Sequence, residues 1–435
     1  MNNPIACPCL MIAAPSSGSG KTTLTAALAR WHTRQGRKVR IFKAGPDFID
    51  PMILQQACGA PVYSLDLGMM SEQHCRQLLH HAASEADLIL IEGVMGLFDG
   101  KFSAALIARR FQIPVAIVVD VRAMAESFAA VVHGLASLDP TLDIWGCIAN
   151  RAASPRHGEM VSDACRELIP HIPCRAVLRY NAEMAFPERH LGLLQAQEIQ
   201  HLDDKLDQAA AQLEGTALTE LPPPVNFEAP ATTTVTEPAL QGKTIAVARD
   251  AAFSFVYAAN LDFLREQGAE LRFVSPLNDN ELPPCDMLYL PGGYPELHTE
   301  ALSGNQAFLD AVFGFKGPIL AECGGMIYLS ESLTQLDGKQ FELCGALPIR
   351  ITMRDKLQAL GWQKMATSQG ELLAHTFHYS SAVIGDEQLI SDRASNHAGE
   401  PGEPIFRQHN ITASYLHWYF YSNPAAALAL FGVAP

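Results

Sequence analysis

The sequence predicts a protein of two α/β domains joined by a linker, and three observations support this. In residues 1–214, apolar runs of strand length alternate with helical stretches, a pattern typical of a mostly parallel sheet covered by helices. A second α/β pattern occupies residues 242–435. Between them, residues 215–241 contain three consecutive prolines and three consecutive threonines with little hydrophobic periodicity, as expected of an interdomain linker.

The first domain begins with a strand, a Gly/Ser-rich loop and a helix. Residues 10–14 are apolar, residues 15–20 form the loop, and Leu24, Leu28 and Trp31 recur at helical spacing. Backbone N–H groups of such a loop bind phosphates, because unpaired amides and the helix dipole both favour anions. We expect phosphate contacts from Ser17, Gly18, Ser19, Gly20, Lys21, Thr22 and Thr23.

Two side chains of this loop suit nucleoside triphosphate chemistry. Lys21 supplies a positive charge for the β- and γ-phosphates, and the hydroxyl of Thr22 can bind Mg²⁺. The usual loop pattern begins with glycine, whereas this chain has Pro15 at that position. The order of strand, loop and helix still predicts a phosphate-binding loop.

The later strands predicted in the first domain end in polar or charged residues. These strands cover residues 38–42, 87–91, 114–119 and 144–149. In parallel sheets the binding site lies beyond the carboxyl ends of the strands. We therefore expect a common site formed by Lys43, Asp47, Glu92, Asp99 and Asn150.

The second domain contains a candidate nucleophile. Cys323 follows an apolar strand and precedes two glycines, which predicts a sharp turn that exposes the sulfur at a helix N-terminus and lowers the thiol pKa. His417 ends a later strand and is the candidate base. The backbone N–H groups of Gly293 and Gly324 would stabilise an oxyanion. Tyr419 occupies the position where a carboxylate usually orients such a histidine, and the sequence does not identify what replaces it.

Composition limits the class of protein further. The net charge of −15 argues against nucleic acid as a partner, since nucleic acid requires a positive surface. No apolar run is long enough for a transmembrane helix, and no secretory signal is expected. Ten cysteines without a C-x-x-C pair indicate buried or free thiols in a reducing, cytoplasmic environment.

Taken together, these motifs resemble the cobyrinic acid a,c-diamide synthase family, including the hydrogenobyrinic acid enzymes. The similarity runs nearly end to end and rests on S-G-S-G-K-T-T, K-A-G-P-D-F-I-D-P, E-G-V-M-G-L-F-D-G, P-E-R-H-L-G-L, L-P-G-G-Y-P-E and A-E-C-G-G. Family members resemble dethiobiotin synthetase in the first half and carry a triad-type glutamine amidotransferase domain behind it. The family pattern G-H-E-F-H-Y-S appears with two changes, as A-H-T-F-H-Y-S at residues 374–380.

The resemblance implies ATP- and Mg²⁺-dependent amidation of the a and c acetates of a corrin acid in cobalamin biosynthesis. An acyl phosphate would be the intermediate, and glutamine would supply the nitrogen. The roles that follow are glutamine hydrolysis for Cys323 and His417; Mg²⁺ binding for Thr22, Asp47 and Glu92; charge neutralisation for Lys43; adenine contact for Asn150; and corrin contact for Asp99, Arg189 and His190.

Several alternatives stay open at this point. Another tetrapyrrole amidase, either nickel-sirohydrochlorin a,c-diamide synthase or cobyric acid synthase, is the nearest one, although the K-A-G-P-D-F-I-D-P segment favours the a,c-diamide type over cobyric acid synthase. A P-loop regulatory ATPase with an inactive amidotransferase-like domain is a rival from a different class. The sequence does not decide whether the ring carries cobalt, which carboxylate reacts first, or whether the chain forms a homodimer.

Overall fold

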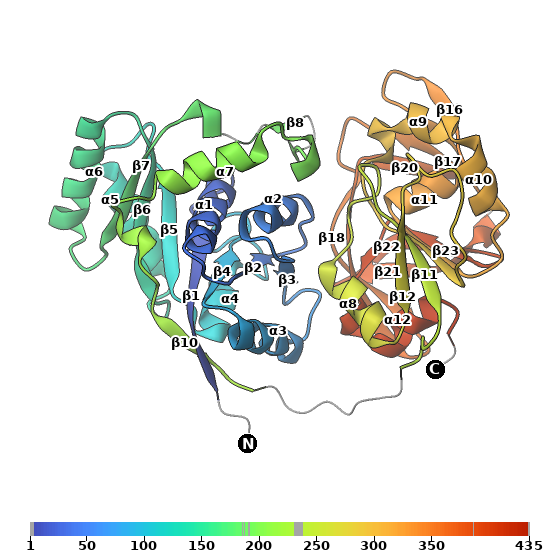
Figure 1. Cartoon of the computed structure of the whole chain (residues 1–435), viewed down its shortest axis with the longest axis horizontal. Coiled ribbons are helices and arrows are strands. Elements are labelled where there is room, and N and C mark those ends of the chain that lie inside the picture. The colour runs from blue at the N-terminus through green and yellow to red at the C-terminus, as the bar shows by residue number, and fades with distance from the viewer. Residues whose placement is uncertain are drawn as a thin grey trace. The chain divides into compact units, whose positions relative to one another are not determined.

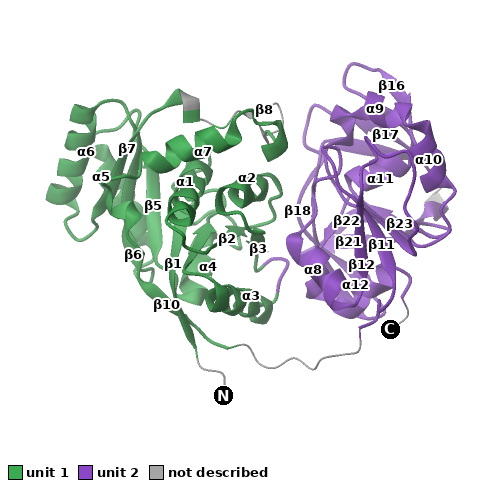
Figure 2. Cartoon of the chain, in the orientation of Figure 1, with its two compact units in different colours: residues 1–67, 71–232 green, residues 68–70, 233–435 purple. Residues whose placement is uncertain are grey.

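The computed structural model describes residues 4–184, 186, 188–189, 192–229, 238–385 and 387–433. It divides into two compact units (Figure 2). Unit 1 comprises residues 1–67 and 71–232, and unit 2 comprises residues 68–70 and 233–435. Among the described residues, no helix combines the length and the apolar character needed to cross a membrane.

Unit 1 is built on an eight-stranded sheet with seven parallel strands in the order β3-β2-β4-β1-β5-β6-β7 (Figure 1). The eighth strand, β10, pairs antiparallel with β1. The strands are β1 (Ile5–Ala13), β2 (Val39–Ala44), β3 (Tyr63–Leu65), β4 (Leu88–Glu92), β5 (Val115–Asp120), β6 (Ile144–Ala152), β7 (Cys174–Arg179) and β10 (Pro224–Phe227). A separate small hairpin joins β8 (Glu188–Arg189) to β9 (Gly192–Leu193).

Helices connect these parallel strands, as the alternating apolar pattern predicts. They are α1 (Lys21–Arg34), α2 (Ile49–Cys58), α3 (Glu72–Glu85), α4 (Ala104–Phe111), α5 (Ser127–Leu138), α6 (Pro155–Leu168) and α7 (Leu202–Ala211). In one core, Leu10 and Ile12 of β1 pack with Leu24 of α1, Leu54 of α2 and Leu206 of α7. Burying such side chains contributes roughly 1.5–3 kcal/mol each and fixes the sheet beneath the phosphate-binding loop.

Two expectations for the end of unit 1 are wrong. The spacing of Ile199, Leu202, Leu206 and Leu213 predicts an amphipathic helix over residues 195–214. The observed helix α7 is shorter, because His201 adopts a left-handed conformation (φ 55°) and α7 starts only after it. The stretch 215–241 is not linker throughout, since β10 within it pairs with the first residues of β1. Its alternating exposed and buried residues give it the period of a strand.

Unit 2 contains a ten-stranded mixed sheet in the order β12-β11-β13-β14-β23-β22-β21-β18-β19-β24, and a four-stranded sheet in the order β16-β15-β17-β20. Its strands are β11 (Thr244–Ala248), β12 (Glu270–Val274), β13 (Met287–Leu290), β14 (Ile319–Glu322), β15 (Ser330–Thr334), β16 (Gln340–Glu342), β17 (Leu347–Met353), β18 (Ala359–Thr367), β19 (Gly370–His378), β20 (Ser380–Ile384), β21 (Ile390–Asn396), β22 (Pro401–Gln408), β23 (Ile411–Ser414) and β24 (His417–Trp418). Its helices are α8 (Ala258–Glu266), α9 (Thr299–Gly304), α10 (Gln306–Phe313), α11 (Gly324–Leu329) and α12 (Pro424–Leu430).

The parallel strands of unit 2 position the candidate nucleophile. β14 lies between β13 and β23, and all three run parallel. Cys323 follows β14, and a Pro-Gly-Gly loop follows β13. The short strand β24 then pairs with β19, with His417 directly opposite His375. The sheet therefore gathers the cysteine, the glycines and the histidine of the sequence prediction in one unit.

Candidate active site

The loop before α1 has the backbone geometry of a tight strand-to-helix turn. Gly20 caps α1 in the left-handed conformation (φ 94°), and Lys21 is the first helical residue. The Lys21 ammonium donates to the carbonyl of Ser16 at 3.1 Å and to that of Met95 at 2.6 Å. Burial lowers the pKa of Lys21 to about 8, and the neighbouring charge of Lys43 acts in the same direction. The lysine therefore lies within the loop that the sequence predicts.

Side chains from β6 hold this loop from outside. The amide of Asn150 donates to the carbonyl of Ser19 at 3.0 Å, and the guanidinium of Arg151 donates to that of Gly18 at 2.7 Å. Arg151 also forms an ion pair with Asp120 at 2.7 Å. Sequence reasoning selected Asn150 but missed Arg151, although it is the next residue at the same strand end.

The glycine-rich segment after β4 packs directly against the loop. Gly93 and Leu97 donate backbone N–H groups to the carbonyls of Ile12 and Ala14, both in strand β1 or directly after it. A Cβ atom on Gly96 would lie 2.5 Å from the carbonyl oxygen of Pro15. The two motifs therefore form one structural element, in which glycine permits the close backbone approach.

A buried lysine with three carboxylates lies at the ends of β2 and β4. The Lys43 ammonium contacts Glu92 at 3.0 Å and Asp47 at 3.6 Å, and it also forms an ion pair with Asp50. The hydroxyl of Thr22 donates to Glu92 at 2.6 Å. Asp50 lies in α2 within the K-A-G-P-D-F-I-D-P segment, and sequence reasoning did not single it out.

Burial and mutual charge shift the pKa values of this group. Burial raises the pKa of Glu92 to about 7, while Lys43 opposes the shift. Burial and the charge of Asp50 raise the pKa of Asp47 to about 6. Burial alone would lower the pKa of Lys43, but the three carboxylates outweigh it, so the lysine stays charged. Such clusters of perturbed groups are typical of functional sites.

The donor set of this group is suited to a hard divalent cation. Carboxylate and hydroxyl oxygens are the ligands that Mg²⁺ prefers. The Oε2 atom of Glu92 is buried and has no hydrogen-bond partner among the described residues. A buried carboxylate oxygen without a partner is costly unless a ligand satisfies it. Thr22, Asp47 and Glu92 therefore fit the expected magnesium site.

Of the three residues expected to contact the corrin, the structure describes the side chain of Asp99 alone. Asp99 accepts the backbone N–H of Gly96 at 2.8 Å, so its carboxylate holds the glycine-rich segment. Arg189 lies in β8, but its side chain is not described, and His190 lies outside the described residues. Their contact with substrate stays a prediction.

In unit 2, Cys323 occupies a strained backbone turn. Its φ of 43° and ψ of −101° lie outside the favoured regions, and such a conformation costs on the order of 1–3 kcal/mol. Its N–H donates to the carbonyl of Ser414 at 2.7 Å, which ties the turn to β23. The sharp turn of the sequence prediction is present, and such strain is typical of active sites.

The environment of the sulfur differs from the expectation. Cys323 is buried, with an exposed fraction of 6%, so the prediction of an exposed sulfur is wrong. Its pKa is raised rather than lowered, first by burial and then by the charges of Glu296 and Glu403. The backbone N–H of Gly324 acts in the opposite direction but does not offset this rise. The thiolate therefore has to form as a base takes the proton.

The glycines at positions 292, 293 and 324 lie in close contact with their neighbours, which include the candidate base His417. A Cβ atom on Gly292 would lie 2.3 Å from Cε1 of His417, and one on Gly324 would lie 2.9 Å from the backbone nitrogen of Gly293. One on Gly293 would lie 2.0 Å from the carbonyl oxygen of Ala252. The backbone of both loops thus approaches closely at the positions expected to form the oxyanion hole.

A carboxylate that sequence reasoning missed lies beside the candidate base. Glu322, the last residue of β14, has its Oε2 atom 3.9 Å from Nδ1 of His417. Its position directly before Cys323 was visible in the sequence, but the spacing to His417 gave no signal. Tyr419, at the expected position of the acid, instead packs its ring edge-on against Tyr257 with centroids 5.6 Å apart.

The altered A-H-T-F-H-Y-S segment forms a second buried polar group. His378 contacts Glu403 at 2.9 Å and stacks on Tyr415 with ring centroids 3.6 Å apart. The hydroxyl of Thr376 donates to the same Glu403 at 3.1 Å. The His378–Glu403 pair links β19 to β22, since each strand contributes one of its residues.

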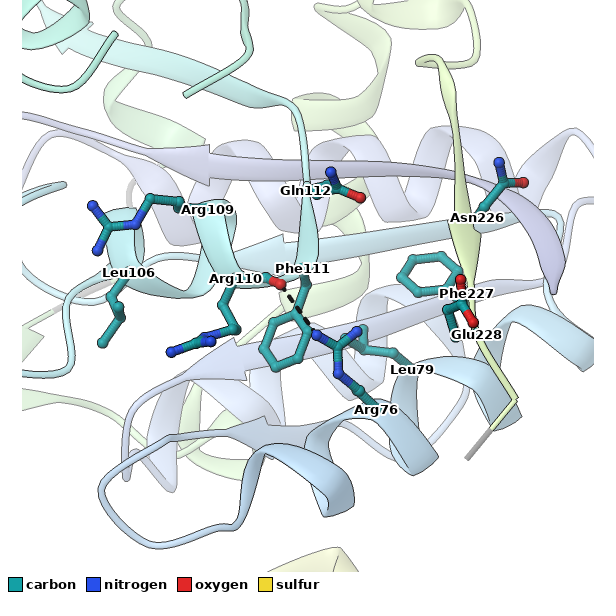
Figure 3. Close-up of a pocket in the computed structure, with 10 residues that line it drawn as sticks. All are labelled: Arg76, Leu79, Leu106, Arg109, Arg110, Phe111, Gln112, Asn226, Phe227 and Glu228. Carbon is teal, nitrogen blue, oxygen red and sulfur yellow. Dashed lines mark hydrogen bonds between the residues drawn. The ribbon is translucent and has the colours of Figure 1, made fainter. Parts of the chain in front are cut away.

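A separate cavity of about 950 Å³ lies among α3, α4 and β10 (Figure 3). Arg76, Arg109, Arg110 and Phe227 are among its lining residues. Glu72 pairs with Arg76 and Arg110, and Asp139 pairs with Arg109. Each of the three arginines therefore has an acidic partner, and none of the described residues that line the cavity is a predicted site residue.

The ten cysteines are all free. Three of them, Cys147, Cys165 and Cys174, gather between β6, α6 and β7 with their sulfur atoms within 4.8 Å of one another. Cys147 and Cys165 are buried. Buried thiols behave as small apolar side chains, which agrees with the sequence expectation.

The geometry defines a class of protein: a nucleotide-binding α/β unit joined to a glutamine amidotransferase unit. Comparison with known families supports both parts. Residues 10–193 match the CobQ/CobB/MinD/ParA nucleotide-binding domain. Residues 244–425 match the CobB/CobQ-like glutamine amidotransferase domain.

Relatives match nearly the whole chain. The hydrogenobyrinate a,c-diamide synthases of Pseudomonas aeruginosa and Stutzerimonas stutzeri are 52% and 51% identical, with 98% of each chain covered. The cobyrinate a,c-diamide synthase of Herminiimonas arsenicoxydans is 48% identical over 97% of this chain and 96% of its own. The chain belongs to the cobyrinate and hydrogenobyrinate a,c-diamide synthase family.

The loop geometry predicts different effects for its two glycines. Gly18 and Gly20 both have positive φ, but a Cβ on Gly20 would lie 2.2 Å from Nδ2 of Asn150, whereas one on Gly18 meets no atom within 4 Å. We expect Gly20→Ala to weaken binding of a non-hydrolysable ATP analogue by roughly tenfold more than Gly18→Ala, measured by calorimetry. The loss should shrink in an Asn150→Ala background, because the clash is then removed. This account of the loop would be contradicted if Gly18→Ala, Gly20→Ala and Gly20→Ala in the Asn150→Ala background all lost the same amount of binding affinity.

Proposed function

We propose that this chain amidates the a and c acetate carboxylates of a corrin acid, using ATP, Mg²⁺ and glutamine. The observation that supports this best is that one chain carries both a phosphate-binding loop with a buried lysine–carboxylate group and a strained Cys–His site. A carboxylate is a poor electrophile and has to be activated, most simply as an acyl phosphate. The two sites supply the activation and the nitrogen respectively.

Unit 1 would carry out the activation. The loop amides and Lys21 hold the triphosphate, and Lys43 offsets negative charge on the phosphoryl and carboxylate oxygens. Thr22, Asp47 and Glu92 would hold Mg²⁺, which neutralises phosphate charge when bound. Asp50 keeps Lys43 in place through their buried ion pair. Asn150 would contact the adenine, in addition to its bond to the loop.

Unit 2 would release the nitrogen. Cys323 attacks the side-chain amide of glutamine while His417 takes the thiol proton, and this proton then leaves with ammonia. The N–H groups of Gly293 and Gly324 would stabilise the oxyanion. Water hydrolyses the thioester to glutamate, and the ammonia displaces phosphate from the activated carboxylate in unit 1.

The ring acid itself is proposed from the relatives. The relatives from Pseudomonas aeruginosa and Stutzerimonas stutzeri are named for hydrogenobyrinate, and the relative from Herminiimonas arsenicoxydans is named for cobyrinate. Arg189 suits a bidentate contact with a substrate carboxylate, and Asp99 and His190 would lie beside it. On an acidic chain, a local positive charge is needed for a polycarboxylate substrate.

Changing the nitrogen source separates the two sites. Lys21→Ala should abolish synthesis with either glutamine or ammonium, because activation precedes nitrogen transfer in both cases. Cys323→Ala should abolish glutamine-dependent synthesis and glutamate release but keep synthesis from ammonium at alkaline pH, where NH₃ is abundant. Cys285→Ala, at a part-buried cysteine of the same unit, is the control and should behave as wild type. Glutamine-dependent turnover by Cys323→Ala would overturn the assignment.

Magnesium titration tests the ligand set. Glu92→Gln and Asp47→Asn remove charged oxygens from the proposed site, so we expect the Mg²⁺ concentration for half-maximal synthesis to rise roughly tenfold or more. Glu72→Gln, on α3, where Glu72 pairs with Arg76 and Arg110, should leave the titration unchanged. An unchanged requirement in both site variants would exclude these carboxylates as ligands.

Direct competition identifies the substrate. Hydrogenobyrinic acid lacks the central cobalt that cobyrinic acid carries. We expect kcat/KM to be higher for one of the two acids, and that acid is the substrate. We expect two amidations of the preferred ring acid, detected by mass spectrometry. A folded protein that hydrolyses ATP and glutamine but amidates neither acid would contradict the proposed function and favour another tetrapyrrole substrate.

A further inference from the structure

The Cys–His site lacks an acid at the position where the sequence pattern would place one, yet a buried carboxylate lies next to the histidine. We propose that Glu322, directly before the nucleophile, is the positioning residue that orients His417 and balances its charge during glutamine hydrolysis. This inference rests on the proposed function of unit 2. In the usual pattern, the acid that orients the histidine lies two residues after it. Here the proposed acid lies at the end of β14, directly before the cysteine.

The contacts of Glu322 fix it on both oxygens. Oε1 accepts the backbone N–H of Trp418 at 3.1 Å, and Oε2 accepts the hydroxyl of Tyr289 at 2.9 Å. Oε2 also lies 3.9 Å from Nδ1 of His417. The side chains of Glu322 and His417 are only 1% and 2% exposed. One carboxylate therefore holds the backbone of residue 418 and faces the imidazole of residue 417.

The ring of His417 is confined on another side as well. A Cβ on Gly292 would lie 2.3 Å from Cε1 and 3.1 Å from Nδ1, so the backbone of the Pro-Gly-Gly loop lies against this edge of the imidazole. The proposal assigns Nδ1 to Glu322, whose Oε2 lies 3.9 Å away, and leaves Nε2 to exchange a proton with Cys323. This is the tautomer that an acid partner selects in Ser–His–Asp sites.

Electrostatics explains why such a partner is needed. Burial lowers the pKa of His417 to about 3, and His375 and His378 add to this. Moving the proton from the Cys323 sulfur to His417 creates an imidazolium in a site that disfavours it. A carboxylate about 4 Å away stabilises that cation. When ammonia leaves with the proton, His417 is neutral again and the carboxylate is unchanged.

The inference predicts a pH dependence. Burial raises the pKa of Glu322 to about 8, against the effect of its bonds from Tyr289 and Trp418. The active carboxylate is the form present above this pKa, so glutamine hydrolysis should rise with pH through this range. Tyr289 contacts Glu322, His375 and His378 act on His417, and Cys323 is influenced by Glu322, Glu296 and Glu403. Burial also raises the pKa of Glu296 to about 7, so this carboxyl titrates in the same range.

Neutralising the carboxylate tests the inference. In Glu322→Gln we expect kcat for glutamate release to fall roughly 10- to 100-fold with little change in KM, because the loss affects proton transfer and not glutamine binding. Ammonium-dependent synthesis should stay at the wild-type level. Glu322→Asp keeps the charge and should recover part of kcat. Cys285→Ala, elsewhere in unit 2, is the control and should keep the wild-type kcat.

The pH profile of kcat, recorded across roughly pH 6 to 9, separates positioning from a structural role. The rise near the pKa of Glu322 should be present in wild type and Glu322→Asp and absent in Glu322→Gln. A Glu322→Gln enzyme with wild-type kcat and an unchanged profile would overturn the inference. If Glu322→Gln does not fold, Glu322→Asp provides the test instead, because its shorter side chain displaces the carboxylate. A wild-type kcat in Glu322→Asp would then overturn the inference. Wild-type protein that releases no glutamate would instead overturn the proposed function.

Discussion

Desolvation of charge at the carboxyl ends of parallel strands is the constraint on which both units depend. Lys43 is almost fully buried, and only its three carboxylate neighbours keep it charged. Removing one partner of a buried ion pair typically costs about 3–5 kcal/mol, because the remaining charge is left uncompensated. The group in unit 1 therefore has to be complete, and its members are tied to β2, α2 and β4. Because these elements are fixed by the packing of the sheet, the side chains of the site are held in place as well.

Unit 2 meets the same constraint with fewer charges. Its nucleophile and base are both buried and neutral at rest, since burial raises the pKa of Cys323 and lowers that of His417. Such a pair is inert until a substrate amide accepts the sulfur. The two units thus use burial differently. Unit 1 stabilises permanent charges through partners, whereas the cysteine and histidine of unit 2 become charged only during the reaction.

Much of this architecture could be predicted from the sequence because parallel strands place their ends together. Lys43, Asp47 and Glu92 were selected as strand-end residues, and the structure brings their side chains within hydrogen-bonding or ion-pair distance of one another through Lys43. Asp50 was missed because it lies in a helix and reaches the site only when α2 packs beside β2. Strand β10 was missed because three prolines obscure its alternating pattern, and His201 ended a helix that the apolar spacing would continue.

Glu322 shows where sequence spacing stops being informative. Its carboxylate and the imidazole of His417 come from residues 95 positions apart, on β14 and on β24, and β24 does not pair with β14 in the sheet. Their proximity depends on the turn after Ser414, which carries the chain from β23 back over the end of β14 and into pairing with β19. A carboxylate two residues after the histidine would be readable from sequence alone. In this chain Tyr419 fills that position with an aromatic contact, and the fold places a different carboxylate beside the same nitrogen.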